Sequence, residues 1–307
     1  MDLIPPSRAA QSPALSALAG SNPGYLASLI TAASDSIRKT CGRDFTLTTY
    51  SEYYSGGIYI REPLRLRQFP VVEITRVAAS PRPALLVQNT DSVTNQRATI
   101  ETTLTGLRLV RIASAIPTTI DLPFTTYPTI ATMVAAIIAQ TNGWSATIRN
   151  DFTNWPSADL KPLQGAATTL NGGRDLEIYT EDLQPFTAWP YSATIGEGAC
   201  DDGCQGTTGW RLDDQTGELF GRFPRGQLNI RIDYQAGFPA VPQPVQEACV
   251  QLVQDLYQAA LVNHSLKKAK LGPGSIELNA QAGTAAMSPK VRMLLAGYMD
   301  YSKVIFR

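Results

Sequence analysis

Histidine is nearly absent from this 307-residue chain, which contains only His264. A metal site built from several histidines is therefore excluded, and a Ser-His-Asp or Cys-His catalytic arrangement would depend on this one residue. The phosphate-binding patterns Gly-x-x-x-x-Gly-Lys-Ser/Thr and Gly-x-Gly-x-x-Gly are also missing. His264 lies beside lysines near the end of a predicted helix, where we interpret it as a solvated residue favoured by the helix dipole. We expect a protein that is not an enzyme and that needs neither a metal nor a cofactor.

Charge and long apolar runs are sparse as well. Charged residues make up 17% of the chain and the formal net charge is zero, which gives no overall electrostatic case for binding nucleic acid or membranes. No apolar run approaches the roughly 20 residues of a membrane span, and the start of the chain lacks the pattern of a signal peptide. We therefore expect a protein of the cytoplasm that makes no membrane contact and has ample apolar residues for a core.

Cysteine is scarce, with four residues in two different settings. Cys41 and Cys249 lie on the apolar faces of predicted helices, so we interpret them as core residues. Cys200 and Cys204 flank Asp-Asp-Gly and, with no second ligand pair nearby, make an incomplete zinc set. A loop with reduced thiols is the simplest interpretation of this pair, and a local disulfide is the alternative.

Two acidic pairs and a group of tyrosines offer weaker signals. Asp201-Asp202 and Asp213-Asp214 could bind calcium, but their spacing fits no EF-hand loop. The tyrosines could stack on bases, although packing across neighbouring strands is the better interpretation. The group consists of Tyr50, Tyr53, Tyr54 and Tyr59.

The charges that are present are unevenly distributed. Residues 80–224 contain 9 Lys and Arg against 15 Asp and Glu, a net charge of −6, and the rest of the chain carries +6. Much of the basic excess follows Leu266. An acidic middle and a basic tail are expected to meet different partners. The basic residues of the tail are Lys267, Lys268, Lys270, Lys290, Arg292, Lys303 and Arg307.

The first strong pattern is a helix followed by two strands. Asn22 and Pro23 are suited to begin the helix and Gly42 to end it. Strands are predicted at 45–54, which is rich in threonine and aromatic residues, and at 71–77. The apolar stripe of the helix consists of Leu26, Leu29, Ile30, Ala33 and Ile37.

The second strong pattern, at 225–262, is a strand followed by a helix. Leu228, Ile230 and Ile232 alternate with polar residues, as in a half-buried strand. Each of the two predicted helices carries one apolar stripe and needs a partner, so we expect 24–77 and 228–262 to share one core. The stripe of the second helix consists of Val245, Ala248, Cys249, Leu252, Val253, Leu256 and Tyr257.

Together the two patterns resemble the head-tail connector, or adaptor, family of tailed bacteriophages. The resemblance rests on Cys-Gly-Arg-Asp-Phe at 41–45, Tyr-Ser-Glu-Tyr-Tyr-Ser-Gly-Gly at 50–57, Phe-Pro-Val-Val-Glu-Ile-Thr-Arg-Val at 69–77 and Tyr-Gln-Ala-Gly-Phe-Pro at 234–239. It covers about 90 residues. Members of this family resemble one another in forming a twelve-fold ring beneath the portal protein, around a DNA channel, with a C-terminal segment that engages the portal.

The other segments are assigned around this connector core, which is expected at 1–79 and 225–272. Family members begin with a fuller helix than 1–22 provides, so this segment is either a short helical turn or an arm that orders on a partner. The strand pattern breaks after Val77, and 80–224 is interpreted as an inserted, separable α+β domain on the outside of the ring.

The C-terminal segment, 273–307, is expected to dock on the portal. Gly272-Pro273-Gly274 would let it leave the core, its basic charge suits an acidic surface, and its last apolar residues could add a strand to another sheet. The alternative is that the residues around Val291 pack back on their own subunit. The expected docking residues are Val291, Arg292, Leu294, Leu295, Val304, Ile305, Phe306 and Arg307. The expected core residues are Leu26, Leu29, Ile30, Ile37, Ile230, Ile232, Leu252 and Leu256.

The sequence therefore predicts an α+β fold: a small helical core with a β-hairpin and strand unit, interrupted by a mixed α+β domain. The resemblance implies a structural virion protein of the neck, assembled in the host cytoplasm, that joins capsid to tail and continues the DNA channel. Its partners would be further copies of itself, the portal protein and a tail, stopper or nozzle protein, and DNA would pass without sequence-specific binding. The alternative is a carbohydrate- or host-factor-binding module carried by 80–224.

Overall fold

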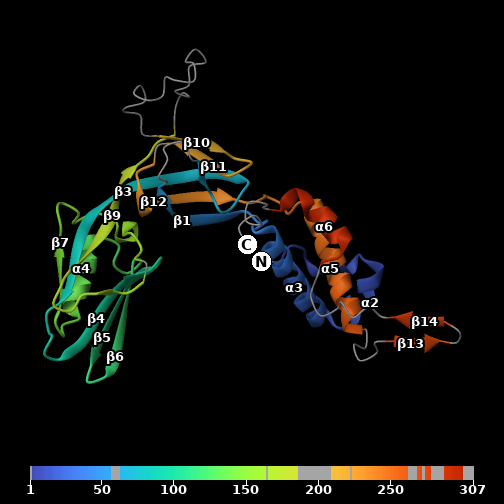
Figure 1. The fold of residues 1–307 in the computed structure, drawn as a ribbon, viewed down its shortest axis with the longest axis horizontal. Helices are drawn as coiled ribbons and strands as arrows, with labels where there is room; N and C mark the ends of the chain where they lie inside the picture. The colour runs from blue at the N-terminus through green and yellow to red at the C-terminus, as the bar shows by residue number, and fades with distance from the viewer. Residues whose placement is uncertain are drawn as a thin grey trace, which may run out of the picture.

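A computed structural model describes residues 2–56, 63–163, 165–185, 209–221, 223–261, 268–271, 274–277 and 287–299. These residues form an arch (Figure 1). A helical lobe of α1, α2, α3, α5 and α6 makes one end, and a distal lobe of β4 to β9 with α4 makes the other. A platform of strands, β1, β12 and the first half of β3 with β2, β10 and β11, lies between them. Helices and antiparallel sheets together confirm the predicted α+β class.

The helical lobe packs around one apolar core. Its helices are α1 (Pro6–Ala10), α2 (Pro13–Ser21), α3 (Pro23–Cys41), α5 (Gln243–Leu261) and α6 (Pro289–Leu295). The predicted ends of α3 are confirmed: the Asn22 side chain accepts a hydrogen bond from the Tyr25 N–H at 3.1 Å, and Gly42 ends the helix with a φ of 70°. The N-terminal segment is not an arm, because Ile4 and Leu15 are fully buried in this core.

The platform is an antiparallel sheet in which β12 lies between β1 and β3. Ile232 pairs with Val77 on one side and with Glu52 on the other. The small sheet of β10, β11 and β2 packs on it, with Leu219 fully buried in the shared core. The strands are β1 (Thr48–Gly56), β2 (Leu64–Arg65), β3 (Val71–Asn89), β10 (Trp210–Asp213), β11 (Glu218–Gly221) and β12 (Gly226–Ala236).

The two segments with strong sequence patterns come together in space and their helices share one core, as expected, but the prediction that the strands belong to the same core is wrong. Helix α3 packs on α5 in the helical lobe, whereas β1, β3 and β12 bury their apolar side chains in the separate core of the platform. The side chains of a sheet stand perpendicular to it and pack on the strands that cover that face, so they do not reach the helix stripes.

The distal lobe has a third core, formed by residues between Ala84 and Ile178. Its main sheet has the order β6-β5-β4-β8, and α4 packs on β7 and β3. Thr129 caps α4 and forms a capping box with Thr132. The elements are β4 (Asn95–Thr102), β5 (Gly106–Ala113), β6 (Ile116–Pro123), α4 (Ile130–Ala139), β7 (Trp144–Ile148), η1 (Ser157–Asp159), β8 (Ala167–Thr168) and β9 (Arg174–Asp182).

The inserted region does not behave as one unit with the expected bounds of 80–224. Residues from 84 to 178 have their own core, but Leu183 and Leu219 are buried in the platform. The β10–β11 hairpin therefore belongs to the platform, because β11 pairs with β2 from the first sequence pattern.

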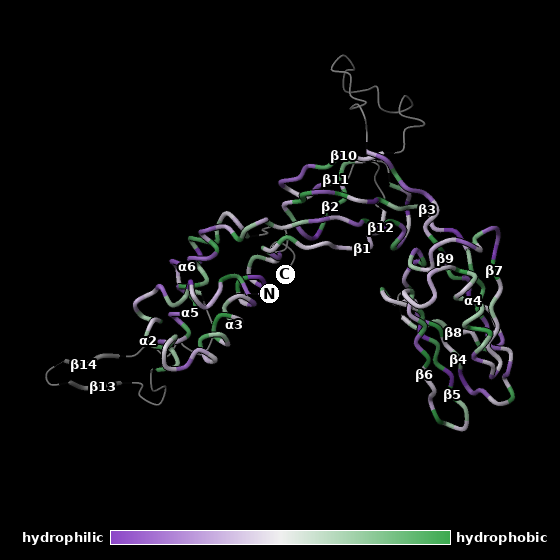
Figure 2. The backbone as a smooth tube through the Cα atoms, turned by 180° about the vertical axis from the view of Figure 1, so that it is seen from behind, coloured by the Kyte–Doolittle hydropathy of each residue, from purple (hydrophilic) through white to green (hydrophobic). Residues whose placement is uncertain are grey.

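β3 does not end at Val77 but continues to Asn89, and Figure 2 shows it running from the platform into the distal lobe. Its course bends where Ser80 has a φ of 54°. Pro81 and Pro83 are tolerated because this stretch pairs with β9 on one side only, so their missing N–H groups break no second ladder.

Three smaller elements lie in the C-terminal part of the described chain. Strands β13 (Lys268–Leu271) and β14 (Gly274–Glu277) form an antiparallel pair, and η2 (Ala296–Tyr298) follows α6. No helix in the described ranges is both long enough and apolar enough to cross a membrane.

Candidate functional site

The predicted docking segment includes α6, and this helix packs back on its own chain. Val291 and Leu295 are fully buried in the helical core, and Leu294 is half-buried at its edge. These side chains form no docking surface in this structure, because α5 already covers them. Arg292 and Met293 are exposed, Met293 by 72%. The other predicted docking residues, Val304, Ile305, Phe306 and Arg307, lie outside the described residues.

The predicted core residues are divided between two cores. Ile230 and Ile232 are fully buried in the platform, and Leu29 and Leu256 are half-buried at the rim of the helical core. The residues buried inside the helical core are Leu26, Ile30, Ile37 and Leu252.

The two described thiols are buried core groups, as predicted. Cys41 and Cys249 are free, and burial raises the pKa of each thiol to about 11. A thiolate nucleophile is therefore disfavoured at both positions. In the described part of the chain, no three His, Cys, Asp or Glu side chains are grouped as a metal site would require. The candidate residues outside the described part are Tyr59, Cys200, Asp201, Asp202, Cys204 and His264.

Asp213 holds a turn. Its Oδ1 accepts hydrogen bonds from the N–H groups of Gln215 at 3.1 Å and Thr216 at 3.3 Å, between β10 and β11. The backbone hydrogen bond from Thr216 is the main reason that the pKa of this carboxyl is lowered. The role seen for Asp213 is thus to shape the hairpin.

Tyr50 and Tyr53 of β1 pack across strands, which confirms the simpler interpretation for these two residues. The rings of Tyr50 and Tyr234, which are paired residues of β1 and β12, lie 5.5 Å apart, and those of Tyr53 and Tyr179 lie 6.1 Å apart. The hydroxyl of Tyr234 donates to Glu52 at 2.8 Å. Burial raises the pKa of Tyr50 to about 12.

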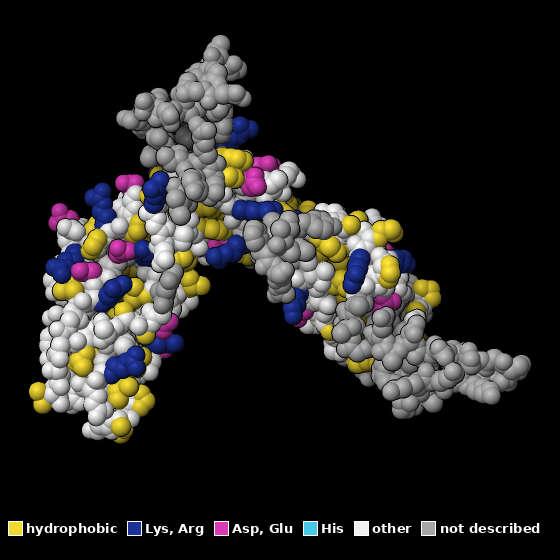
Figure 3. All heavy atoms as spheres, viewed as in Figure 1, with side chains coloured by type: hydrophobic (Ala, Val, Ile, Leu, Met, Phe, Trp, Pro, Cys, Tyr) yellow, Lys and Arg dark blue, Asp and Glu magenta, His cyan; other side chains and the backbone are white. Residues whose placement is uncertain are grey.

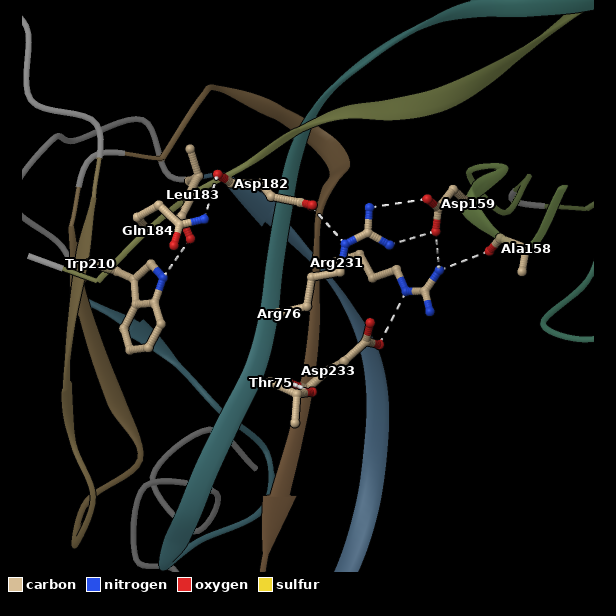
Figure 4. A network of polar contacts seen from close by, with 10 residues as sticks. All are labelled: Thr75, Arg76, Ala158, Asp159, Asp182, Leu183, Gln184, Trp210, Arg231 and Asp233. Atoms are coloured by element: carbon tan, nitrogen blue, oxygen red, sulfur yellow. Dashed lines mark hydrogen bonds and ion pairs between the residues drawn. The ribbon is translucent and has the colours of Figure 1, made fainter. Parts of the chain in front are cut away.

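A polar network joins the distal lobe to the platform (Figure 4). Asp159 on η1, with its side chain only 7% exposed, lies between Arg76 of β3 and Arg231 of β12. Arg76 donates from Nη1 to Oδ1 at 2.7 Å and from Nη2 to Oδ2 at 3.0 Å, and Arg231 donates from Nη1 to Oδ1 at 3.0 Å. Each arginine has a second acidic partner: Arg76 pairs with Asp182 at 2.6 Å and Arg231 with Asp233 at 3.1 Å.

Further hydrogen bonds reinforce this junction. The Tyr179 hydroxyl donates to the carbonyl of Leu228 at 2.5 Å, and Leu228 has a φ of 48°, in the left-handed region that is unfavourable for leucine. At the bend of β3, the Thr180 hydroxyl donates to the carbonyl of Ser80 at 2.6 Å, and the Ser80 hydroxyl donates to Glu181 at 2.6 Å.

A cleft of about 590 Å³ lies beside the junction and is lined from both sides. Lys161 of its wall pairs with Glu177 at 2.8 Å. Its volume falls in the range of small-molecule sites, and its polar groups would suit a hydroxyl-bearing or charged ligand. The charged and polar residues of the lining are Lys161, Arg174, Asp175, Glu177 and Gln227.

The exposed apolar side chains of the distal lobe lie on its turns, at the start of β6 and on α4. Val93, in the turn between β3 and β4, is 98% exposed. Figure 3 shows such side chains as separate yellow groups toward the free end of the lobe, not as one continuous patch. The others are Leu104, Ile116 and Ile138.

The junction residues were not predicted from the sequence. The sequence pattern gives one signal for them: Arg231 alternates with Ile230 and Ile232 and so lies on the opposite face of β12. Its partner Asp159 lies 72 residues earlier in a short turn that has no periodic pattern. Only the tertiary fold brings the two together.

The chain was also compared with known proteins. No protein-family model matches it, and a search of curated proteins found no match.

Proposed function

We propose that this chain is a head-tail connector: a structural virion protein that forms a ring below the portal, joins capsid to tail and continues the DNA channel. One observation carries the proposal. The two segments with connector-like motifs, which the distal lobe separates in sequence, form one contiguous unit. Strand β12 inserts between β1 and β3, and α5 packs on α3. The later segment thus completes the earlier one.

The form of the chain also suits a protein that works through its interfaces. The helical lobe, the platform and the distal lobe have separate cores, so the arch exposes a large surface to neighbouring subunits. A ring requires two different surfaces of one subunit to meet, and an extended subunit offers such surfaces at its two ends. Few charges need to be desolvated in such contacts, because charged residues make up only 17% of the chain.

In this proposal the portal contact is assigned to residues after α6, because Val291 and Leu295 already serve the chain's own core. The test is truncation after Met299, followed by co-sedimentation with assembled portal protein of the same virus. We expect the truncated protein to keep the thermal stability of the full chain and to lose portal binding. Binding equal to that of the full chain would refute the docking role of the tail.

The position of the truncation and the choice of control make this test specific. Truncation after Gly272 also removes Val291 and Leu295 and uncovers the helical core, so it would confuse docking with folding. The variant Met293→Ser changes an exposed residue of α6 and is the matched control. It should bind the portal as the full chain does.

The second candidate, a carbohydrate-binding module, is favoured by the cleft beside the junction. Arg174 lines it, and Gln227 could bind hydroxyl groups. A glycan-array screen of the full chain and of Arg174→Glu separates the two functions. A ligand that binds the full chain and not the variant would favour this candidate, and no binding by either protein favours the connector.

A further inference from the structure

We infer that Asp159 sets the orientation of the distal lobe relative to the platform, as the positioning residue of the joint between them. The inference concerns a single chain and goes beyond the proposed function, so it holds whether or not the protein forms a ring.

The strands that cross the joint do not fix its angle by themselves. In the described part of the chain, β3 and β9 are the strands that run from the platform into the distal lobe. A two-stranded ribbon twists and bends more readily than a wide sheet. The left-handed Ser80 and the register shift between Pro83 and Leu85 fall in this ribbon. A further contact is therefore needed to hold one orientation.

On the distal side, η1 is fixed to its lobe. The Ser157 N–H donates to the carbonyl of Pro128 at 2.9 Å. The Ser157 hydroxyl donates to the backbone carbonyl of Tyr127 at 2.5 Å. Leu160, the next residue after η1, forms a bridge with Ile178 of β9. Any motion of the distal lobe thus moves η1 with it.

On the platform side, η1 is held through its acidic residue. The hydrogen bonds from Arg76 are bidentate, and Arg231 donates both to Asp159 and to the carbonyl of Ala158, the latter at 2.8 Å. Charge-assisted bidentate pairs are strong and directional, and solvent screens them little when the carboxylate is buried. They fix η1 against two neighbouring strands at once (Figure 4).

The arginines are positioned independently of Asp159. Asp182 orients Arg76 and Asp233 orients Arg231, and in each case the acidic residue lies on a strand of the same sheet. Removal of the Asp159 charge should therefore release the distal lobe without unfolding the platform or the lobe.

The test measures distances between spin labels in the intact chain by double electron–electron resonance. Cysteines introduced at Val72 of the platform and Val93 of the distal lobe carry the labels whose distance reports the orientation across the joint. Both positions are exposed. Labels at Val93 and Leu104 report the inside of the distal lobe. Cys200 and Cys204 are replaced by serine, whereas the buried Cys41 and Cys249 stay unlabelled. Mixing with excess unlabelled protein removes distances between chains.

Asp159→Asn is expected to broaden the Val72–Val93 distance distribution, within the limits set by the remaining Arg231–Ala158 and Tyr179–Leu228 hydrogen bonds, and to leave the Val93–Leu104 distance unchanged. Arg231→Gln should do the same from the platform side. The control is Asp121→Asn, which removes an exposed ion pair with Arg108 inside the distal lobe and should change neither distance. An unchanged Val72–Val93 distribution in both joint variants would overturn the inference. So would a change in the Val93–Leu104 distance, because Asp159 would then be needed for the fold of the lobe itself.

Discussion

The Tyr179 hydroxyl of β9 donates a hydrogen bond of 2.5 Å to the carbonyl of Leu228 on β12, at the joint between distal lobe and platform. Tyr179 is fully buried, and Leu228 adopts a left-handed conformation that is rare for leucine. A buried hydroxyl is costly unless it is paired, so this bond links the two lobes and compensates for the burial of Tyr179.

Tyr179→Phe should lower the free energy of unfolding by about 0.5–1.5 kcal/mol, because the ring remains packed while the hydrogen bond is lost and the Leu228 carbonyl loses its partner. Urea denaturation measures the change. Tyr127→Phe is the control, since its hydroxyl makes no hydrogen bond with the described residues, and a change below about 0.5 kcal/mol is expected there. Equal effects of the two substitutions would mean that the Tyr179 hydroxyl contributes nothing specific.

Removal of the distal lobe should leave a soluble, folded remainder if the cut follows the observed cores. Pro81 and Tyr179 are cross-strand partners, so replacing 82–178 by Asn-Gly closes β3 and β9 with a two-residue hairpin turn. Deletion of 80–224 instead removes Leu183 and Leu219 from the platform core and should give an insoluble protein. Circular dichroism and gel filtration compare the two deletions. A soluble 80–224 deletion would contradict the assignment of the β10–β11 hairpin to the platform.

The helical lobe provides a test of its core within one helix. Ile30→Ala removes a fully buried side chain of α3 and should cost about 2–5 kcal/mol of unfolding free energy. Tyr25→Ala, five residues earlier on the exposed side of α3, should cost less than about 1 kcal/mol. Thermal or urea denaturation measures the unfolding free energy of both variants. Similar costs at the two positions would argue against the packing of α3 on α5.

Alkaline pH should destabilise the protein through its two buried thiols. Because burial raises the pKa of Cys41 and Cys249 from 9.0 to about 11, the folded state retains these protons more tightly than the unfolded state. The stabilisation is complete below pH 9.0 and is lost as the pH rises through 11. In the double variant Cys41→Ala/Cys249→Ala, the denaturation midpoint should fall less between pH 9.0 and about 11 than in the unsubstituted chain. The same fall in both proteins would show that other groups cause it.

The helices and caps were predictable because they depend on local chemistry. Asn22 and Gly42 mark the ends of α3, and Thr129 marks the start of α4, through hydrogen bonds and backbone angles of the residues themselves. The alternation of Ile230 and Ile232 likewise predicted a strand with one buried face.

What could not be predicted depends on distant partners. Pro81 and Pro83 disfavour a continuous strand, yet β9 supplies the pairing that carries β3 past them. The stripe of Val291 and Leu295 would suit a partner's surface or its own lobe equally well, and only the position of α5 decides this. The same holds for Asp159, whose role arises from two strands that are far away in sequence.

The mass of the assembly in solution tests the connector proposal most directly. Native mass spectrometry or light scattering of the purified chain, alone and with portal protein, distinguishes a ring from a monomer. A twelve-fold ring of a 33.2 kDa chain would have a mass of about 400 kDa. We expect this species, alone or on the portal. A species of 33.2 kDa under both conditions would contradict the proposal.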